Sequence, residues 1–544
     1  MKKNSFVEGT IVAYIAILLT KVLGAIYVIP FYKIIGTNGG VLYGYAYNIY
    51  NLFLNISTSG IPTAVAIIIS EYNALKMFNE REYTYKLANK LIATISFIAF
   101  LVMFIFAKQL ALFYIGDLSG GNSIDNVVLV IRVISLCLLV VPFLSVTRGY
   151  LQGNKYVSIS SFSQLLEQVA RIVVVLIGSY VAINVLNLGV PIGVSVALFG
   201  TVFGAFVAFM FLKYKIRKNR DELLCGVDKS KKLNITTFAL CKKIIYLAIP
   251  IIIIAITQNI YEMVDLKFIL KGLYMIGFDA STCELLGSII VTWTPKICMI
   301  INALALGLCN SVIPFIVEDF VKGNLNSVNS KFNQAINTIL FVAVPLSLFI
   351  ITFKNNVYYL FYGESNYGGV VLAMMSVVSI TFSISLVINM ILQGMKKHKM
   401  VYINTVAGLI INACLDIPMI LLLNKIGFHP YLGTLFATFI GQLVAISLVL
   451  LSLKKEYKFH YRDIFKTFSK MILPLVSMII VLFILSRFVS NSGGYLIRII
   501  KLGICGILSV GTYLFVAYKN KSINAILGDE IINKVLGKFK RNRG

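Results

Sequence analysis

The chain lacks long hydrophilic stretches, cysteine pairs and a phosphate-binding loop. Only 13% of its 544 residues are charged and 58% are hydrophobic, which excludes a soluble globular protein because no soluble fold hides so much apolar surface. None of its eight cysteines forms a CxxC pair, which argues against a metal centre or a redox site. The sequence contains no GxxxxGK(S/T) motif, so we expect no ATP hydrolysis by the chain itself.

Apolar runs of membrane-spanning length recur from one end of the chain to the other. A helix needs about 20 such residues to cross the hydrocarbon core of a bilayer. The first run is too long for a cleaved signal peptide and has no small-residue cleavage pattern, so we interpret it as a retained span. The sequence therefore predicts an all-α polytopic membrane protein with fourteen spans. These are 9–35, 43–70, 91–116, 127–151, 157–184, 188–213, 244–270, 286–317, 333–353, 368–393, 400–424, 431–453, 468–489 and 496–518.

Positive charge is abundant but unevenly distributed along the chain. The formal net charge is +27, from 49 Lys and Arg against 22 Asp and Glu. If both termini are cytoplasmic, the cytoplasmic segments hold about 35 Lys and Arg and the outer loops about 5. This is the positive-inside pattern, so the basic excess sets the topology and has anionic lipid as its neighbour. A nucleic-acid partner is not expected.

The longest hydrophilic connection, 214–243, divides the first twelve spans into two sets of six. The tripeptide Leu-Gln-Gly closes the fourth span at Leu151 and the tenth span at Leu392, and a basic turn follows each copy. The same element at equivalent points predicts a duplication. The predicted parts are an N-lobe at 1–213, a basic cytoplasmic linker at 214–243, a C-lobe at 244–453, two further spans at 454–518 and a basic cytoplasmic tail at 519–544.

The fifth span carries ionisable residues at depth. If its helix enters the bilayer near Val157, a rise of about 1.5 Å per residue places Glu167 roughly 15 Å deep. One ionised group there costs about 2.5–3.5 kcal/mol. Glu167 and Arg171 share a helical face and are flanked by Gln164. Two interpretations stay open: a structural ion pair that fixes the helix to a neighbour, or a contact with a substrate or gate. Arg148, at the end of the fourth span, is interpreted as an interfacial anchor.

Two lysines also lie near the middle of predicted spans. Lys21 lies about twelve residues into the first span, and Lys296 is similarly deep in the eighth, directly after Pro295. A lysine reaches the interface easily from a helix end but poorly from its centre. We therefore expect both ammonium groups to line a wet cavity, where they would suit an anion such as a pyrophosphate. The alternative is that each extends to the headgroups.

Oxygen-bearing side chains gather in later spans. Asn412 and Asp416 share a face of the eleventh span, Thr434 and Thr438 share one of the twelfth, and Asp265 lies in the seventh. Carboxylate, amide and hydroxyl oxygens can replace the water around a hard cation, so this set is a candidate Na⁺ or proton site. In the alternative interpretation, the two acids make only local or interfacial contacts.

Three segments carry a resemblance to a known family. They are LLTKVLGAIYVIPFYKIIG, SGIP at 59–62 followed by SE at 70–71, and RGYLQG at 148–153 followed by SQ at 163–164, EQ at 167–168 and Arg171. On these motifs the whole chain resembles the multidrug/oligosaccharidyl-lipid/polysaccharide (MOP) exporter superfamily. Within it, the chain is similar to the polysaccharide-biosynthesis branch of Gram-positive bacteria, which contains lipid II flippases and stage V sporulation protein B.

The resemblance implies two six-helix lobes in a V, a cationic central cavity, and a groove for a lipid tail lined by the last two helices. Lys21 matches a basic cavity position. Asn55 stands where better-known lipid II flippases carry arginine, which leaves room for another polyprenyl-linked glycan. The resemblance also implies a sodium site at Asp265, Asn412, Asp416 and either Thr434 or Thr438.

The leading hypothesis is a flippase of the bacterial cytoplasmic membrane that moves an undecaprenyl-pyrophosphate-linked sugar by alternating access. Lys21, Lys296 and Arg171 would hold the pyrophosphate, and Na⁺ or H⁺ would be the coupling ion, without another cofactor. We expect a monomer, not an enzyme, with membrane lipids and cell-wall synthesis proteins as neighbours. The competing hypotheses are a cation-coupled multidrug antiporter of the same superfamily and a non-transporting scaffold for envelope or spore assembly.

Overall fold

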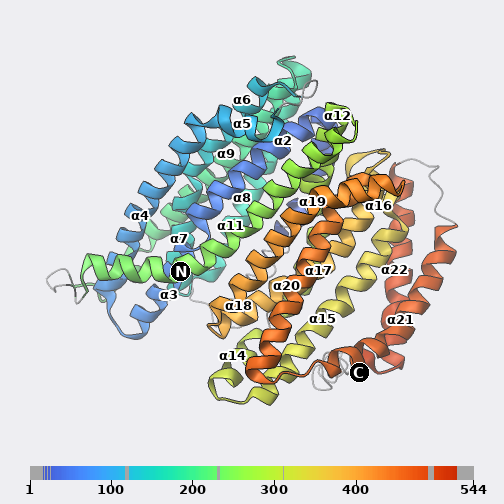
Figure 1. Cartoon of the computed structure of the whole chain (residues 1–544). Helices are drawn as coiled ribbons and strands as arrows, with labels where there is room; N and C mark the ends of the chain where they lie inside the picture. Colours follow the sequence, from blue (N-terminus) through green and yellow to red (C-terminus); the bar gives the residue numbers. More distant parts are fainter. Residues whose placement is uncertain are drawn as a thin grey trace, which may run out of the picture. The chain divides into compact units, whose positions relative to one another are not determined.

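A computed structural model describes residues 16, 19–20, 22–24, 26–116, 122–228, 233, 235–309, 312–487 and 495–523. Over these residues the chain is helical and contains no strand (Figure 1). The prediction of an all-α polytopic membrane protein is confirmed. Lys21 and most of the basic tail predicted at 519–544 lie outside the described residues.

Thirteen helical segments among the described residues are long and apolar enough to cross a membrane. The first, Val22–Ala74, has 53 residues, which at about 1.5 Å per residue is more than twice the thickness of a hydrocarbon core. Gly36 breaks it with φ 65° and ψ −172°, a conformation that glycine adopts readily. The first two predicted spans lie on either side of this glycine, so the thirteen segments agree with fourteen spans.

The α-helices of the described residues have the following bounds, and Figure 1 labels all of them except α10 and α13. They are α2 (Val28–Thr58), α3 (Ile61–Ala74), α4 (Phe78–Ile105), α5 (Ala107–Ile115), α6 (Ile124–Ser135), α7 (Val141–Gly153), α8 (Val157–Val173), α9 (Val190–Lys218), α10 (Arg220–Leu223), α11 (Thr237–Met275), α12 (Ala280–Ser288), α13 (Thr294–Cys309), α14 (Ile313–Val321), α15 (Leu325–Thr352), α16 (Lys354–Tyr362), α17 (Gly368–Gly394), α18 (His398–Tyr402), α19 (Gly408–Lys425), α20 (Gly433–Tyr457), α21 (Arg462–Ser486) and α22 (Tyr495–Lys519). The described residues also form 3₁₀ turns at Leu136–Leu139 and Pro430–Leu432.

In the part of the chain that the structure describes, four π-helical turns interrupt or extend the spans, and each backbone bond in them reaches five residues along the chain. They are Val174–Gly178, Val181–Val185, Ile289–Trp293 and Ile403–Ala407. Three of them lie within five residues, in sequence, of a candidate site residue, namely Arg171, Lys296 and Asn412. Such turns are frequent at functional sites because they redirect the side chains next to them.

The chain forms two compact units, Met1–Thr292 and Trp293–Gly544. The sequence placed the division earlier, in the hydrophilic connection 214–243. The difference arises because α11, the seventh span, packs against α2, α3 and α12 of the first unit. A hydrophilic connection marks where the chain leaves the membrane, but it does not decide which neighbours the next helix contacts.

Helix lengths repeat between the two units at a constant separation. Both α4 and α15 have 28 residues, and both α5 and α16 have nine. The starts are 247 residues apart in each pair, at 78 and 325 and at 107 and 354. The shorter helix of each pair is followed by a glycine with positive φ, Gly116 or Gly363. These matches support the duplication that the sequence predicts.

The turn after each Leu-Gln-Gly copy has the same backbone geometry. Lys155 and Lys396 adopt left-handed φ values of 67° and 58°. In both turns, the amide of the next residue donates a hydrogen bond to a leucine carbonyl, at 2.9 Å for Leu151 and 2.8 Å for Leu392. Such bonds satisfy carbonyls left open at a helix C-terminus. The tripeptide therefore marks one helix-ending motif that is built twice.

Candidate functional site

Glu167 on α8 is paired with Arg148 on α7. An Arg148 Nη2 donates to Glu167 Oε2 at 2.8 Å, and its Nε donates to the Ser163 hydroxyl, also at 2.8 Å. The two charged side chains are 13% and 22% exposed, so the pair is largely shielded from solvent. Of the two interpretations of Glu167, the geometry agrees with an ion pair that fixes α8 to a neighbour. The interpretation of Arg148 as only an interfacial anchor misses this contact.

Arg171 lies among aromatic rings one turn further along α8. Its guanidinium carbon is 5.6 Å from the centroid of the Tyr27 ring. Tyr43 and Tyr47 of α2 also interact with it, and their rings stack with centroids 5.4 Å apart. Aromatic faces attract a cation by about 2 kcal/mol when the contact is desolvated, so this cluster can hold a positive charge inside an apolar bundle. Arg171 is thus surrounded by different groups from Glu167.

Close helix packing sets the position of Glu167 and Arg171. A Cβ on Gly204 of α9 would lie 2.6 Å from the Glu167 carbonyl oxygen and 3.0 Å from the Arg171 Cβ. Only glycine fits at that distance, because real Cβ contacts are not so short. Because residue 204 has no side chain, α8 and α9 can approach closely at Glu167 and Arg171.

The remaining first-unit candidates have separate surroundings. Gln164 is half-buried on α8. Asn55, near the end of α2, accepts a hydrogen bond from the Ser59 hydroxyl at 2.7 Å. Asp265 is half-buried on α11. Lys21 lies outside the described residues, so its place in a cavity stays a prediction.

Lys296 on α13 lies against the single tryptophan of the chain. Its Nζ is buried and is 4.1 Å from the centroid of the Trp293 ring. Trp293 is completely buried, and its carbonyl accepts a hydrogen bond from the Tyr362 hydroxyl at 2.8 Å. The π-helical turn Ile289–Trp293 and Pro295 directly precede the lysine. Pro295 cannot donate a backbone hydrogen bond, which favours an irregular helix at this point.

Four of the five candidate cation ligands lie together in the second unit. Asn412, Asp416 and Thr434 are fully buried and Thr438 is 7% exposed. The Thr438 hydroxyl is 3.0 Å from the Asn412 Oδ1 and 2.9 Å from the Thr434 carbonyl oxygen. These groups offer carboxylate, amide, hydroxyl and carbonyl oxygens, the donor set of a hard cation. The fifth candidate, Asp265, belongs to the first unit.

Glycines bring α19 and α20 together around this oxygen cluster. A Cβ on Gly441 would lie 2.7 Å from the Gly408 carbonyl oxygen and 3.2 Å from the Asn412 amide nitrogen. A Cβ on Gly433 would lie 2.5 Å from the Ile420 amide nitrogen. Small residues permit this approach between membrane helices, and it places the Thr438 hydroxyl within reach of Asn412.

Arg171 and Asn412 occupy matching positions in the two units. Each is fourteen residues after the start of its span, at 157 and 398. Each also has its backbone nitrogen and Cβ against a glycine of the following long helix, Gly204 for Arg171 and Gly441 for Asn412. The duplicated framework therefore presents a guanidinium at this position in one unit and an amide in the other.

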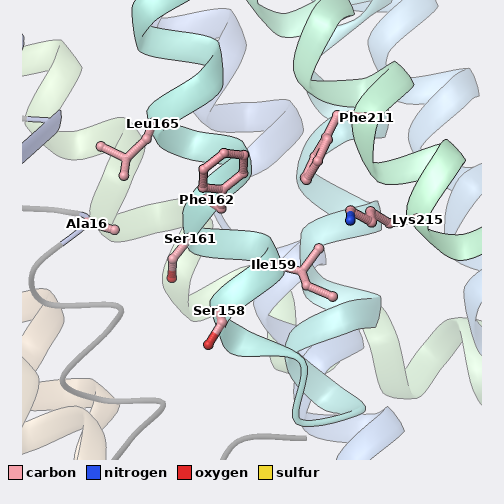
Figure 2. A pocket seen from close by; sticks show the side chains of 8 residues that line it. All are labelled: Ala16, Ser158, Ile159, Ser161, Phe162, Leu165, Phe211 and Lys215. Carbon is pink, nitrogen blue, oxygen red and sulfur yellow. The ribbon is translucent and has the colours of Figure 1, made fainter. Parts of the chain in front are cut away.

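A groove of about 530 Å³ runs beside the start of α8, where Phe162 and Phe211 have ring centroids 5.4 Å apart (Figure 2). Lys215 of α9 lies over the Phe211 ring, with its Nζ 5.6 Å from the centroid. The described residues that line the groove are mostly apolar, with one cation and two hydroxyls. They are Ala16, Ser158, Ile159, Ser161, Phe162, Leu165, Phe211 and Lys215.

The second unit has a groove at the matching place, with a volume of about 600 Å³. Three lining residues of the fifth span, Ser158, Ile159 and Phe162, correspond at a separation of 241 positions to Lys399, Met400 and Ile403. At the separation of 237 positions between Gly204 and Gly441, Lys215 corresponds to Ser452. The two repeats therefore form similar grooves from different side chains, as they also place different side chains at Arg171 and Asn412.

Two family models match the chain. Residues 6–277 match the family described as polysaccharide biosynthesis protein, and residues 284–417 match the family described as MatE. The first match covers half of the chain, and the second contains Lys296, Asn412 and Asp416.

Curated relatives and solved structures agree with these matches. The chain is 29% identical over 550 residues to the lipid II flippase MurJ of Bacillus subtilis (strain 168), covering 99% of each chain. It is 24% identical over 237 residues to stage V sporulation protein B of the same organism, covering 43% of this chain and 44% of that protein.

Among solved structures, a lipid II flippase MurJ in an inward closed conformation matches with a TM-score of 0.65 and 16% identity, covering 94% of this chain and 99% of that one. An inward-facing multidrug resistance transporter of the MATE family matches with a TM-score of 0.61 and 15% identity, covering 82% and 99%. At these identities the structural matches show a common fold.

Proposed function

Because the chain belongs to the polysaccharide biosynthesis protein family, we propose that it is a flippase for a polyprenyl-pyrophosphate-linked sugar. It is a multi-pass membrane transporter and not an enzyme. The cargo we propose is lipid II or a related envelope glycan on undecaprenyl pyrophosphate. Alternating access would carry the headgroup across the membrane. We further propose that both termini are cytoplasmic and that the protein acts as a monomer beside cell-wall synthesis proteins.

One observation carries this proposal: the likeness to a lipid II flippase covers 99% of both chains. A likeness confined to a few spans would support only the fold. Here it includes both units and the two additional C-terminal spans, α21 and α22, which lie side by side (Figure 1). The match therefore supports a shared activity as well as a shared architecture.

The cationic residues in the spans suit a pyrophosphate. Arg171 is held by tyrosine rings, and the Lys296 ammonium is buried against Trp293. A fixed positive charge inside a membrane bundle is costly unless it meets an anion or a polar cavity. We propose that Arg171, Lys296 and Lys21 contact the phosphates, with Gln164 and Asn55 toward the sugar.

We also propose that a monovalent cation supplies the coupling. The buried oxygens of Asn412, Asp416, Thr434 and Thr438 offer the ligands that Na⁺ accepts. A proton carried by Asp416 is the other form of this proposal. In either form, the second unit would bind one positive charge during one stage of the transport cycle.

Depletion of the protein in its native host tests the cargo. The expected result is accumulation of one undecaprenyl-pyrophosphate-linked precursor on the inner leaflet, identified by mass spectrometry of leaflet-selective extracts. Re-expression of the wild type should clear the precursor, whereas Lys296→Gln at equal membrane abundance should not. If no lipid-linked precursor accumulates, the flippase proposal is wrong. Rescue by every variant at the buried charges would favour a scaffold.

A cation-coupled drug antiporter is the second candidate, because residues 284–417 match the MatE family. It predicts that expression in a drug-sensitive host raises the minimum inhibitory concentration of cationic compounds. The Arg171 and Lys296 charges disfavour it, since a cationic drug would meet like charge. Drug resistance that depends on Asp416 and not on Arg171 would establish this candidate in place of the flippase.

A further inference from the structure

We propose that the first unit carries a binding site for the headgroup of an anionic phospholipid, in a groove between α4, α7 and α9. The groove has a volume of about 640 Å³ and also touches the first residue of α11. The proposal does not depend on the cargo that the protein moves. The residues used in the argument are Tyr85, Lys86, Lys90, Phe143, Phe209 and Lys213.

Uncompensated positive charge is the first argument. Lys86, Lys90 and Lys213 line the groove and are exposed. None of the three forms an ion pair with a carboxylate of the described residues. By contrast, Lys243 of the same unit is paired with Glu71 at 2.7 Å. Three ammonium groups around one small groove attract an anion with more than one negative oxygen.

The groove walls are fixed, which is the second argument. The Lys213 Nζ is 5.2 Å from the centroid of the Phe209 ring and 5.8 Å from that of Tyr85. Tyr85 in turn stacks on Tyr150 at 4.3 Å and shares a 3.1 Å hydrogen bond with Thr147 on α7. The aromatic cation contacts thus hold Lys213 over the groove before any ligand arrives.

The repeat supplies the third argument. Lys86 and Lys90 are eight and twelve residues after the start of α4 at Phe78, and Asn333 and Asn337 are equally far from the start of α15 at Leu325. Both asparagines are buried. Asn333 donates to the His460 carbonyl just before α21, at 2.8 Å, and Asn337 donates to the Asp463 carbonyl in its first turn, at 3.5 Å.

The chain itself therefore covers this helix face in the second unit. Phe332, the counterpart of Tyr85, packs on the Phe459 ring with centroids 5.8 Å apart. In the described part of the first unit, the same face lines the groove, and exposed lysines stand where the second unit has its two buried asparagines. We infer that the face of α15 that is covered by the chain corresponds to a face of α4 that binds an anionic ligand.

Size and surroundings select a lipid headgroup as the occupant. Pockets of about 300–1,000 Å³ hold small ligands, whereas a membrane helix about 10 Å wide and 30 Å long fills more than 2,000 Å³. The groove lies near one end of the membrane-crossing segments Phe78–Ile105 and Val190–Lys218. Phe143 and Phe209 offer apolar contact for the glycerol and first acyl carbons, and the three lysines suit the phosphate.

The test is a binding titration of the purified full chain by native mass spectrometry. The probes are phosphatidylglycerol and phosphatidylcholine with identical acyl chains. Each lysine near an anionic headgroup contributes about 1 kcal/mol, so the triple variant K86Q/K90Q/K213Q should bind phosphatidylglycerol roughly 100-fold more weakly. Its phosphatidylcholine affinity should not change. The matched control is K76Q/K155Q/K218Q, which removes three exposed lysines of the same unit outside the groove.

Two further arms keep the result decisive. The conservative variant K86R/K90R/K213R should retain phosphatidylglycerol binding, which separates loss of charge from loss of folding. Inorganic phosphate at millimolar concentration should not displace the lipid, because it lacks the apolar part. Equal affinity of the wild type for both lipids would overturn the proposal, as would equal losses in the triple variant and its control. Full displacement by phosphate would overturn the lipid as occupant.

Discussion

The guanidinium of Arg148 lies 2.8 Å from the carboxylate of Glu167 and joins α7 to α8. The contact connects the Leu-Gln-Gly helix end of the fourth span with the helix that carries Arg171. Because both side chains are mostly shielded, removing one partner leaves the other charge without compensation in a poorly solvated place.

We expect Glu167→Gln and Arg148→Gln each to lower the free energy of unfolding by about 1.5–3 kcal/mol, the value of a hydrogen bond to a charged group. The double variant should lose less than the sum of the two. Thermal unfolding of the purified protein measures all four states of the cycle. Additive losses would contradict a direct interaction between the two side chains.

Arg171→Lys should reduce cargo translocation by roughly 5- to 30-fold, because lysine keeps the charge but not the planar face that rests on Tyr27. Reconstituted vesicles with a labelled polyprenyl-pyrophosphate sugar give the rate. The control is Arg217→Lys at the exposed end of α9, which should leave the rate unchanged. Equal rates for both variants would remove Arg171 from the cargo path.

Lys296→Gln should abolish translocation without lowering membrane abundance, whereas Lys296→Arg should keep part of it. The reason is that the buried ammonium over Trp293 is proposed to meet the phosphates, and arginine preserves the charge and the aromatic contact. Quantitative immunoblots and the same vesicle assay provide both readings. Wild-type translocation by the glutamine variant would show that Lys296 has only a packing role.

Sodium should raise the midpoint of thermal unfolding relative to choline. At ten times the dissociation constant, one bound ion stabilises the folded state by about 1.4 kcal/mol. Asn412→Ala, Asp416→Asn and Thr438→Val should each remove this difference, because they delete oxygen ligands or charge. The control is Asn424→Ala, at an exposed position of α19, the helix of Asn412 and Asp416. This variant should keep the sodium effect. A sodium effect that survives in all three variants would locate the ion elsewhere.

Gly204→Ala should lower the free energy of unfolding, because overpacking costs about 1–3 kcal/mol. The gain in helix propensity, ~1 kcal/mol, offsets only part of this cost. The new Cβ would lie 2.6 Å from the Glu167 carbonyl oxygen, so α8 and α9 would have to separate. Gly511→Ala on α22 is the control, since its Cβ would meet nothing within 4 Å. A smaller loss at 204 than at 511 would refute close packing as the reason for Gly204.

Much of the fold could be predicted from sequence because bilayer thickness fixes helix length and apolar runs reveal it. The Leu-Gln-Gly copies indicated the duplication, and the helix lengths support it. The packing boundary at Thr292 could not be predicted, since the contacts of α11 with α2 and α3 leave no signal in hydropathy.

The sequence proposed the candidate residues one by one, but it did not predict the side chains that they contact. Arg148 pairs with Glu167 from another helix, so the spacing between Glu167 and Arg171 gave no indication of it. Trp293 could have been found, because it lies three residues before Lys296 and shares its helical face. The sequence indicated the contacts of Arg171 with Tyr27 and Tyr47 more weakly, because these residues are only tyrosines within apolar runs.

The matching positions of Arg171 and Asn412 bear on how such transporters diversify. A single codon change at one of these positions can alter local polarity in one copy while the other copy and the glycine contacts stay intact. The backbone framework therefore does not tie the chemistry of one position to that of the other. For protein engineers, the same pair offers a site at which to exchange preferences between the halves of one polypeptide.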